Sequence, residues 1–209
     1  MTVLFKSIIW GDCMNIHKAI KLEKKRLKIF TIFMIKLALL LPLVLMLTNL
    51  FTLFYISYLI VIEILICMAI IIKFNAYRVE YRCVNNRLMF KTGILTKENL
   101  LICDKVFLVH TNNCDYDLEI VIITSVVFKN KSLRPVEENF LRRHPQIRKY
   151  YDKIKEKNPD KKYYFQVIRR GGLRKYLLLD SIYRNCVKAT YTDESIQNIK
   201  IARGQMIVE

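Results

Sequence analysis

Glycine and proline are scarce in this 209-residue chain, with five and four copies respectively. A chain so poor in both is neither collagen-like nor a low-complexity disordered segment. Histidine is rarer still: His17, His110 and His144 are the three copies, and none has a Cys, Asp or Glu at the spacing of a metal site or a catalytic triad. We therefore expect no catalytic residue, no metal site and no cofactor, and predict that the protein is not an enzyme.

The chain contains six cysteines but no C-x-x-C pair. They are Cys13, Cys67, Cys83, Cys103, Cys114 and Cys186. This spacing indicates neither a zinc site nor a disulfide framework. We expect all six to be free thiols in a reducing compartment, mostly serving as packing residues.

Hydrophobic residues make up 53% of the chain, and their distribution is very uneven. Residues 31–50 contain one charged residue, Lys36, and residues 51–72 contain one, Glu63. Each stretch is long enough to cross a hydrocarbon core of about 30 Å as a helix. We predict a transmembrane hairpin over residues 31–73. A signal peptide is disfavoured, because 30 residues precede the first stretch and a second apolar stretch follows at once.

The charge is strongly basic, with 35 Lys and Arg against 18 Asp and Glu and a net charge of +17. Such an excess favours an anionic partner, either lipid headgroups or nucleic acid. Both flanks of the hairpin are basic, and the turn between the two apolar stretches is uncharged. By the positive-inside rule, we expect a cell-membrane protein with two spans and both termini in the cytoplasm.

Residues 1–30 are predicted to form a basic, amphipathic cytoplasmic segment, in which Ile16 and Ile20 share one helical face. Its basic side chains before the first span are Lys18, Lys21, Lys24, Lys25, Arg26 and Lys28. Two interpretations stay open: an interfacial helix that binds anionic lipid, or an ordinary positively charged anchor. Met14 is an alternative start, in which case residues 1–13 are an extension.

The two charged residues inside the apolar stretches lie at the same depth. Lys36 and Glu63 are each 13.5 residues from the centre of the turn, which corresponds to about 20 Å along a helix. An ionisable group placed alone in hydrocarbon costs several kcal/mol, so each needs a partner. One hypothesis is an ion pair between the two helices that fixes their register. The other is that Glu63 binds a transmembrane helix of another protein.

Residues 75–209 are predicted to form one cytoplasmic domain. Alternation and β-branched runs predict five strands, over residues 77–84, 87–91, 94–103, 105–111 and 118–128. A helical insertion over residues 135–158 follows. Two more strands, 162–169 and 173–180, are expected to be joined as a hairpin at Gly171-Gly172. A last helix is expected between the N-cap Thr192 and Gly204.

A resemblance to a known family comes from short motifs directly after the hairpin. They are Tyr77-Arg78-Val79, Asn86-Arg87-Leu88 and Thr92-Gly93-Ile94-Leu95-Thr96-Lys97. The order resembles that of bacterial membrane proteins in which a two-helix hairpin precedes a pleckstrin-homology-like domain, and it covers residues 30–103. The resemblance implies a membrane α-helical hairpin plus an α+β domain. That domain would be a pleckstrin-homology-like β-sandwich or barrel of about seven strands with a C-terminal helix. The insertion at 135–158 departs from the family pattern.

Two basic segments are candidate binding sites. In the first, Arg169, Arg170, Arg174 and Lys175 surround Gly171 and Gly172, whose backbone N–H groups could hold a phosphate. The alternative is a solvated hairpin tip whose charges prevent edge pairing. The second segment, residues 142–157, combines basic residues with two adjacent tyrosines that could stack on bases.

These features favour an integral membrane scaffold or interaction protein that presents a basic domain at the membrane surface. Its expected partners are anionic lipid headgroups and a protein. Two alternatives stay open: a nucleic-acid-handling component of a membrane DNA-transfer machine, and an accessory subunit of a transporter or membrane protease.

Overall fold

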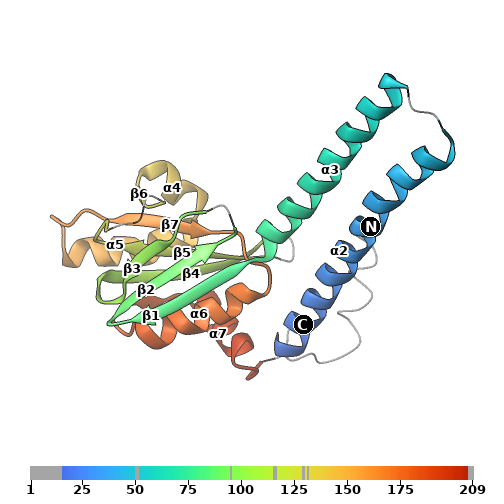
Figure 1. Ribbon diagram of the computed structural model, residues 1–209. Helices are drawn as coiled ribbons and strands as arrows, with labels where there is room; N and C mark the ends of the chain where they lie inside the picture. The colour runs from blue at the N-terminus through green and yellow to red at the C-terminus, as the bar shows by residue number, and fades with distance from the viewer. Residues whose placement is uncertain are drawn as a thin grey trace.

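A pair of long helices projects from a folded α/β domain in the computed structural model (Figure 1). The structure describes residues 16–49, 52–94, 96–114, 117–128, 130 and 132–206. The pair consists of α2 (Ile16–Leu47) and α3 (Leu53–Tyr77), which lie side by side. Both helices are long and apolar enough to cross a membrane. The prediction of two apolar helices is therefore confirmed.

Helix α2 unites two segments that the sequence separates, the basic residues before 31 and the first apolar stretch. Its 32 residues correspond to about 48 Å, well beyond a hydrocarbon core of about 30 Å. The basic half of α2 therefore extends past the apolar half towards the domain. Residues 1–15, which include Met14, lie outside the described residues.

The three-stranded sheet follows α3 directly. It consists of β1 (Val79–Val84), β2 (Arg87–Thr92) and β3 (Asn99–Ile102), all antiparallel, in the order β1-β2-β3. Asn85 and Asn86 form the β1–β2 turn with φ of 49° and 62°, a backbone conformation that asparagine tolerates well. The predicted strand over 94–103 is shorter in the structure. A 3-10 turn, η1 (Cys103–Lys105), follows β3.

The five-stranded sheet has the order β6-β7-β5-β4-β8. Its strands are β4 (Val106–Cys114), β5 (Asp117–Thr124), β6 (Arg134–Pro135), β7 (Tyr164–Ile168) and β8 (Thr190–Tyr191). All neighbours are antiparallel except β4 and β8. The prediction that β4 ends at residue 111 is wrong, because Asn112 and Asn113 continue it opposite Glu119 and Leu118. Cross-strand pairing outweighs the low β-propensity of asparagine here.

Four helices complete the described part of the domain. They are α4 (Glu138–Arg143), α5 (Pro145–Lys157), α6 (Arg174–Asn185) and α7 (Asp193–Ala202). The helical insertion is confirmed as the pair α4 and α5, with Pro145 in the first turn of α5, where its missing N–H costs nothing. The N-cap of α7 is also confirmed, because the Thr192 side chain accepts the N–H of Ser195.

The predicted strand over residues 173–180 is wrong, because this segment is the start of α6. Its buried residues Leu178, Leu179 and Ile182 recur at helical spacing, and a short apolar run is compatible with either structure in sequence. Consequently Gly171-Gly172 is not a hairpin turn but the connection from β7 to α6. The eight described strands form two sheets that do not close into a barrel, and two helices rather than one follow β7.

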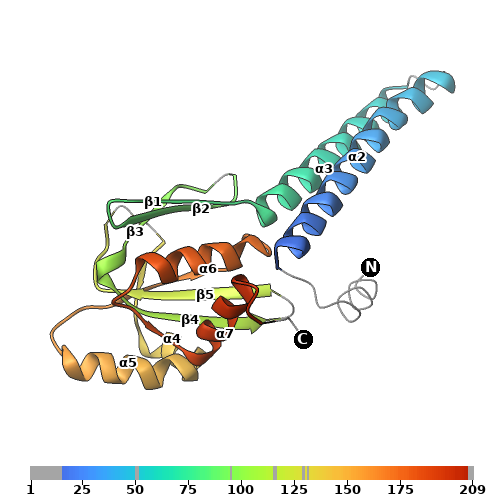
Figure 2. The same cartoon turned by 90° about the horizontal axis from the view of Figure 1, so that it is seen from below.

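Two hydrophobic cores flank the five-stranded sheet. Ile120 and Ile122 of β5 face the first core, which α6 fills between the two sheets (Figure 2). Val121 and Ile123 face the second core, which α4 and α5 cover. Because successive residues of a strand point to opposite faces, a continuous apolar strand such as β5 requires cover on both sides. This arrangement places α5 on the outer side of the domain.

The first core should be sensitive to truncation of α6. We expect Leu178→Ala to destabilise the folded domain by about 2–5 kcal/mol, because Leu178 is fully buried and its removal leaves a cavity. The neighbouring Leu177, which is half-buried, supplies the matched control variant Leu177→Ala, with a smaller loss. Thermal unfolding of the detergent-solubilised full chain measures both. Equal losses would contradict the assignment of α6 as the central element.

Candidate functional site

The connection from β7 to α6 lies against the base of both long helices. Gly171 donates its backbone N–H to the carbonyl oxygen of Ala76 at the end of α3, at 2.8 Å. Leu173 is the N-cap residue of α6. Its backbone N–H donates to both carboxylate oxygens of Glu23 on α2, at 3.3 Å each. A helix N-terminus attracts negative charge, and here a side chain of the same chain supplies it.

Gly172 makes this close approach possible. A Cβ atom at this position would lie 2.5 Å from Oε1 of Glu23 and 2.8 Å from the ring of Tyr77, and its φ is +51°. Gly171, with φ of +131°, is equally crowded by Val79. The absence of a side chain at these two positions therefore allows the helix pair and the domain to pack closely where they meet.

Lys175 is the most deeply buried charged residue of this junction, with a side chain 0% exposed. Its Nζ donates to Oδ1 of Asp117 at 2.6 Å and to the carbonyl oxygen of Arg169 at 2.5 Å. Burial lowers the pKa of Lys175, and the adjacent Asp117 carboxylate opposes this effect. The Arg169 side chain donates from Nε to Glu119 at 2.7 Å.

Four residues of the proposed phosphate loop, Arg169, Arg170, Gly171 and Gly172, lie between β7 and α6, and the other two, Arg174 and Lys175, begin α6. Carboxylates of the chain itself contact three parts of it: Glu23 at the α6 N-terminus, Glu119 at Arg169 and Asp117 at Lys175. Phosphate binding by this loop stays a prediction. An incoming phosphate would have to compete with these carboxylates.

The basic side chains of α2 form a surface at the base of the helix pair, named here the α2 basic surface. It consists of Lys18, Lys21, Lys24, Lys25, Arg26 and Lys28, all exposed. Ile16 and Ile20, on the other side of the same helix, are buried. The amphipathic pattern expected of the basic segment is therefore present over residues 16–30.

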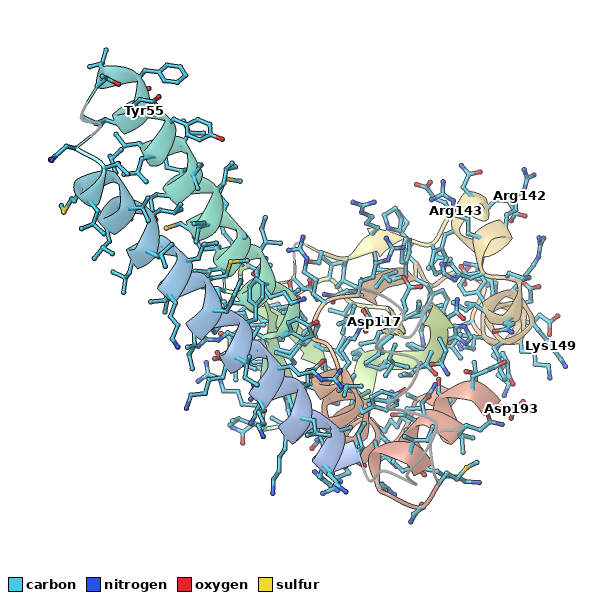
Figure 3. All side chains as sticks on the ribbon, turned by 90° about the vertical axis from the view of Figure 1, so that its right-hand side faces the viewer. Tyr55, Asp117, Arg142, Arg143, Lys149 and Asp193 are labelled. Atoms are coloured by element: carbon cyan, nitrogen blue, oxygen red, sulfur yellow. The ribbon has the colours of Figure 1, made fainter. Side chains whose placement is uncertain are left out.

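A second group of basic side chains, named here the α5 basic surface, lies at the opposite end of the domain. It consists of Arg142, Arg143, Arg148, Lys149, Lys153 and Lys157, all exposed. Figure 3 places Arg142, Arg143 and Lys149 on the side away from the helix pair, and the ribbon views show the same location for α4 and α5. Segment 138–157 carries seven Lys and Arg against three Asp and Glu.

Among the described residues, two of these six side chains have ion-pair partners. Glu138 contacts Arg148 at 3.0 Å and Arg142 at 4.0 Å, and Asp152 contacts Arg148 at 4.0 Å. Within the part of the chain that the structure describes, no ion pair joins Lys149 or Lys153 to a carboxylate. The α5 basic surface is therefore available to an anionic partner.

The two tyrosines of α5 are engaged within the domain. Tyr151 packs edge-on against Tyr163 with ring centroids 5.8 Å apart. Tyr150 donates its hydroxyl to Oδ2 of Asp193 at 3.3 Å. Both are half-buried, and burial is the largest cause of the raised pKa of each. Both rings pack against the second core, which restricts the face that a base could stack on.

A cavity of about 180 Å³ lies between β4 and the start of α5. His110 and His144, the two histidines of the folded domain, line it. His110 is buried, and its Nδ1 lies 3.0 Å from Oγ1 of Thr192. Burial lowers the pKa of both histidines. The Ser195 hydroxyl donates to the carbonyl oxygen of Val109 at 3.0 Å, so this polar cluster ties β4 to the first turn of α7.

Lys36 lies on α2 and Glu63 on α3, and among the described residues no ion pair joins them. Lys36 is exposed, whereas Glu63 is half-buried. Its Oε1 is enclosed and has no hydrogen-bond partner in the part of the chain that the structure describes. Elsewhere Cys67, Cys83, Cys103 and Cys186 are free thiols, and the described residues contain no group of three or more ligand-type side chains arranged for a metal ion.

Comparison with known proteins adds no identification, because no family model, no curated protein and no solved structure matches the chain.

Sequence reasoning missed Glu23 and Asp117. A signal for Glu23 was available, since it is the single acidic residue within residues 16–30 and follows Ile16 and Ile20 on the apolar face. Nothing local marks Asp117, because its partner Lys175 lies 58 residues further along the chain.

The Lys175–Asp117 pair should respond asymmetrically to substitution. We expect Asp117→Asn to destabilise the protein by about 1–3 kcal/mol, because it leaves a buried ammonium without its countercharge. Lys175→Met should cost less, because the remaining Asp117 side chain is 56% exposed and water can solvate it. Thermal unfolding of both variants of the full chain in detergent measures the difference. A greater loss for Lys175→Met would contradict this account.

Proposed function

We propose that this protein is anchored in the cell membrane by α2 and α3, with the folded domain and both termini on the cytoplasmic side. The apolar windows of these helices are 0% and 6% buried, so in water they would expose far more apolar surface than a soluble domain tolerates. The flanking basic residues and the uncharged turn support the orientation. The α2 basic surface then lies at the headgroups, where lysine and arginine attract anionic lipid.

We further propose that the domain is an interaction module whose α5 basic surface binds an acidic protein. The observation that carries this proposal is the position of that surface, at the end of the domain opposite the helix pair. Lipid headgroups beside the anchor account for the α2 basic surface but not for charges directed away from it. Charge complementarity would then steer and orient the partner.

A nucleic-acid-binding function is the second candidate for the same surface. It is less favoured, because Tyr150 and Tyr151 pack against the second core and make contacts within the domain, which restricts stacking on bases. The interaction role also agrees with the resemblance to membrane proteins with pleckstrin-homology-like domains. It does not require the barrel of that family. An accessory subunit of a transporter or membrane protease is one form that such an interaction protein could take.

The orientation predicts a pattern of thiol labelling in intact cells. A membrane-impermeant thiol reagent should leave the wild-type chain unlabelled, because Cys83, Cys103, Cys114 and Cys186 face the cytoplasm. Asn49→Cys should label from outside, since Asn49 lies in the turn between α2 and α3. Permeabilisation followed by unfolding is the control that shows the native thiols to be reactive. Labelling of Cys186 in intact cells would contradict the orientation.

Site-directed photo-crosslinking in cells tests the α5 basic surface. We expect a photo-reactive residue at Lys149 to give a discrete adduct that protease removes and nuclease does not. Arg143→Glu together with Lys153→Glu should reduce the adduct about tenfold, because the attraction becomes repulsion. The matched control is a photo-reactive residue at Lys188, which is 73% exposed, outside the α5 basic surface and paired with Asp104. A nuclease-sensitive adduct would favour nucleic-acid binding. No adduct at Lys149 would overturn both the protein-binding and the nucleic-acid-binding proposals.

A further inference from the structure

The cavity of about 180 Å³ between β4 and the start of α5 has no part in the proposed function. It is smaller than the roughly 300–1,000 Å³ of pockets that take drug-sized ligands, but larger than a single water molecule needs. Among the described residues, its lining contains no carboxylate and consists of His110, Asn112, Arg143, His144, Pro145 and Gln146. The cavity therefore suits a small polar group, and its charge favours an anion.

A chain of hydrogen bonds fixes the position of the proton on the His110 ring. Ser195 donates its hydroxyl proton to the carbonyl oxygen of Val109, at 3.0 Å, because a carbonyl can only accept. The Thr192 hydroxyl is therefore the donor in its 3.0 Å contact with Oγ of Ser195. Since Thr192 has no second proton, its Oγ1 accepts from Nδ1 of His110, at 3.0 Å. The neutral ring consequently carries its proton on Nδ1 and a lone pair on Nε2.

The Nε2 lone pair of His110 is directed at the cavity. His110 is 2% exposed, and its Nε2 has no hydrogen-bond partner among the described residues. Because Thr192 holds Nδ1 and the ring lines the cavity, Nε2 is the nitrogen that faces it. Burial is the largest cause of the lowered pKa of His110, so the ring is neutral at neutral pH. A ligand in the cavity can therefore donate a hydrogen bond to Nε2.

The junction of α4 and α5 supplies positive charge to the same cavity. Arg143 is exposed, and among the described residues no ion pair joins it to a carboxylate. Gln146 lies in the first turn of α5, where backbone N–H groups carry partial positive charge. The cavity therefore offers one acceptor on the β4 side and donors with positive charge on the α5 side.

Two carboxylates act on His110, and neither lines the cavity. Oε2 of Glu194 lies 3.9 Å from Nδ1 of His110, on the side of the ring that Thr192 occupies. Glu119 accepts the Nε–H of Arg169 at 2.7 Å. An anion in the cavity would therefore meet Arg143 without first displacing a carboxylate of the chain.

We propose that this cavity binds a phosphate group that retains a proton. The P–O–H group donates to Nε2 of His110, and Arg143 with the first turn of α5 binds the anionic oxygens. Inorganic phosphate retains a proton at neutral pH, whereas a phosphorylated side chain, with a second pKa of about 6, mostly loses it. We therefore expect free phosphate to be the ligand rather than a phosphorylated protein.

The position of the cavity excludes lipid headgroups as the source in the orientation proposed above. Figure 3 places Arg143 on the side of the domain away from the helix pair, so a ligand reaches the cavity from water. The site goes beyond the proposed function, although Arg143 also belongs to the α5 basic surface. It is separate from the loop between β7 and α6, where carboxylates of the chain contact the basic residues.

Isothermal titration calorimetry of the detergent-solubilised full chain near neutral pH tests this inference, with inorganic phosphate and sulfate as probes. Phosphate should bind saturably. Sulfate should bind at least about tenfold more weakly, because it has no proton to donate to Nε2 of His110. Equal affinity for the two anions, or no saturable binding of phosphate, would overturn the inference.

Arginine substitutions locate the bound phosphate. Arg143→Met should weaken phosphate binding about tenfold, because it removes a charge-assisted hydrogen bond. The matched control is Arg142→Met, at the neighbouring exposed position of α4 that does not line the cavity, and it should leave the affinity unchanged. Arg174→Met, at the start of α6, should also leave it unchanged. A loss with Arg174→Met but not with Arg143→Met would place the phosphate in the loop between β7 and α6 and overturn the inference.

The role of His110 is measured without disturbing the buried ring. Nitrogen NMR of the wild-type chain with labelled histidine should show His110 as the Nδ1–H tautomer, and phosphate should shift its Nε2 resonance. The variant His110→Phe assigns that resonance and, where thermal unfolding shows that it is folded, should bind phosphate about tenfold more weakly. An Nε2–H tautomer, or an Nε2 resonance that phosphate does not shift, contradicts the proposal.

An acidic peptide with one phosphoserine, titrated in the same way, distinguishes the two sources of phosphate. Weaker binding than inorganic phosphate supports a free ligand. Tighter binding that Arg143→Met weakens would support the same site with a phosphorylated protein as the source. Because no partner is present in these titrations, failure of the crosslink at Lys149 would refute the proposed function and leave this inference standing.

Discussion

The carboxylate of Glu23 and the N-terminus of α6 form the contact on which the arrangement of the molecule depends. The first core places α6 between the two sheets, so the N-terminus of α6 is fixed relative to both. Glu23 accepts the N–H at that terminus, and Gly171 donates to the last turn of α3. Both long helices are thereby held to the same loop. The absence of side chains at Gly171 and Gly172 is what lets them approach so closely.

The fold distributes the basic charge of the chain over separate places. The α2 basic surface lies at the base of the helix pair, whereas the α5 basic surface lies at the far end of the domain. Lys175 belongs to neither surface, because its side chain is buried and pairs with Asp117 where the helix pair meets the domain. A net charge of +17 therefore does not describe one continuous binding surface. The burial of β5 on both faces enforces this separation, since α4 and α5 have to cover the outer core.

The charged groups of this chain lie in surroundings with different physics. The α5 basic surface would act in water, where charges steer a partner and salt weakens the attraction. The α2 basic surface would act at the lipid headgroups, where lysine and arginine attract anionic lipid. Lys36 and Glu63 lie within the apolar stretches, where an unpaired charge is costly.

Features that depend on neighbouring residues are predictable from the sequence alone. Residues 31–50 and 51–72 are apolar enough to predict two long helices, Asn85-Asn86 predicts a tight turn, and Thr192 predicts a helix start. Tertiary structure alone decided that residues 173–180 form a helix, because a short apolar run fits a strand or a helix and the first core selects between them. It also decided that Lys36 and Glu63 face different ways, since depth follows from counting residues but direction depends on how two helices pack. The partners of Glu23 and Lys175 come from distant segments of the chain, so no local pattern contains them.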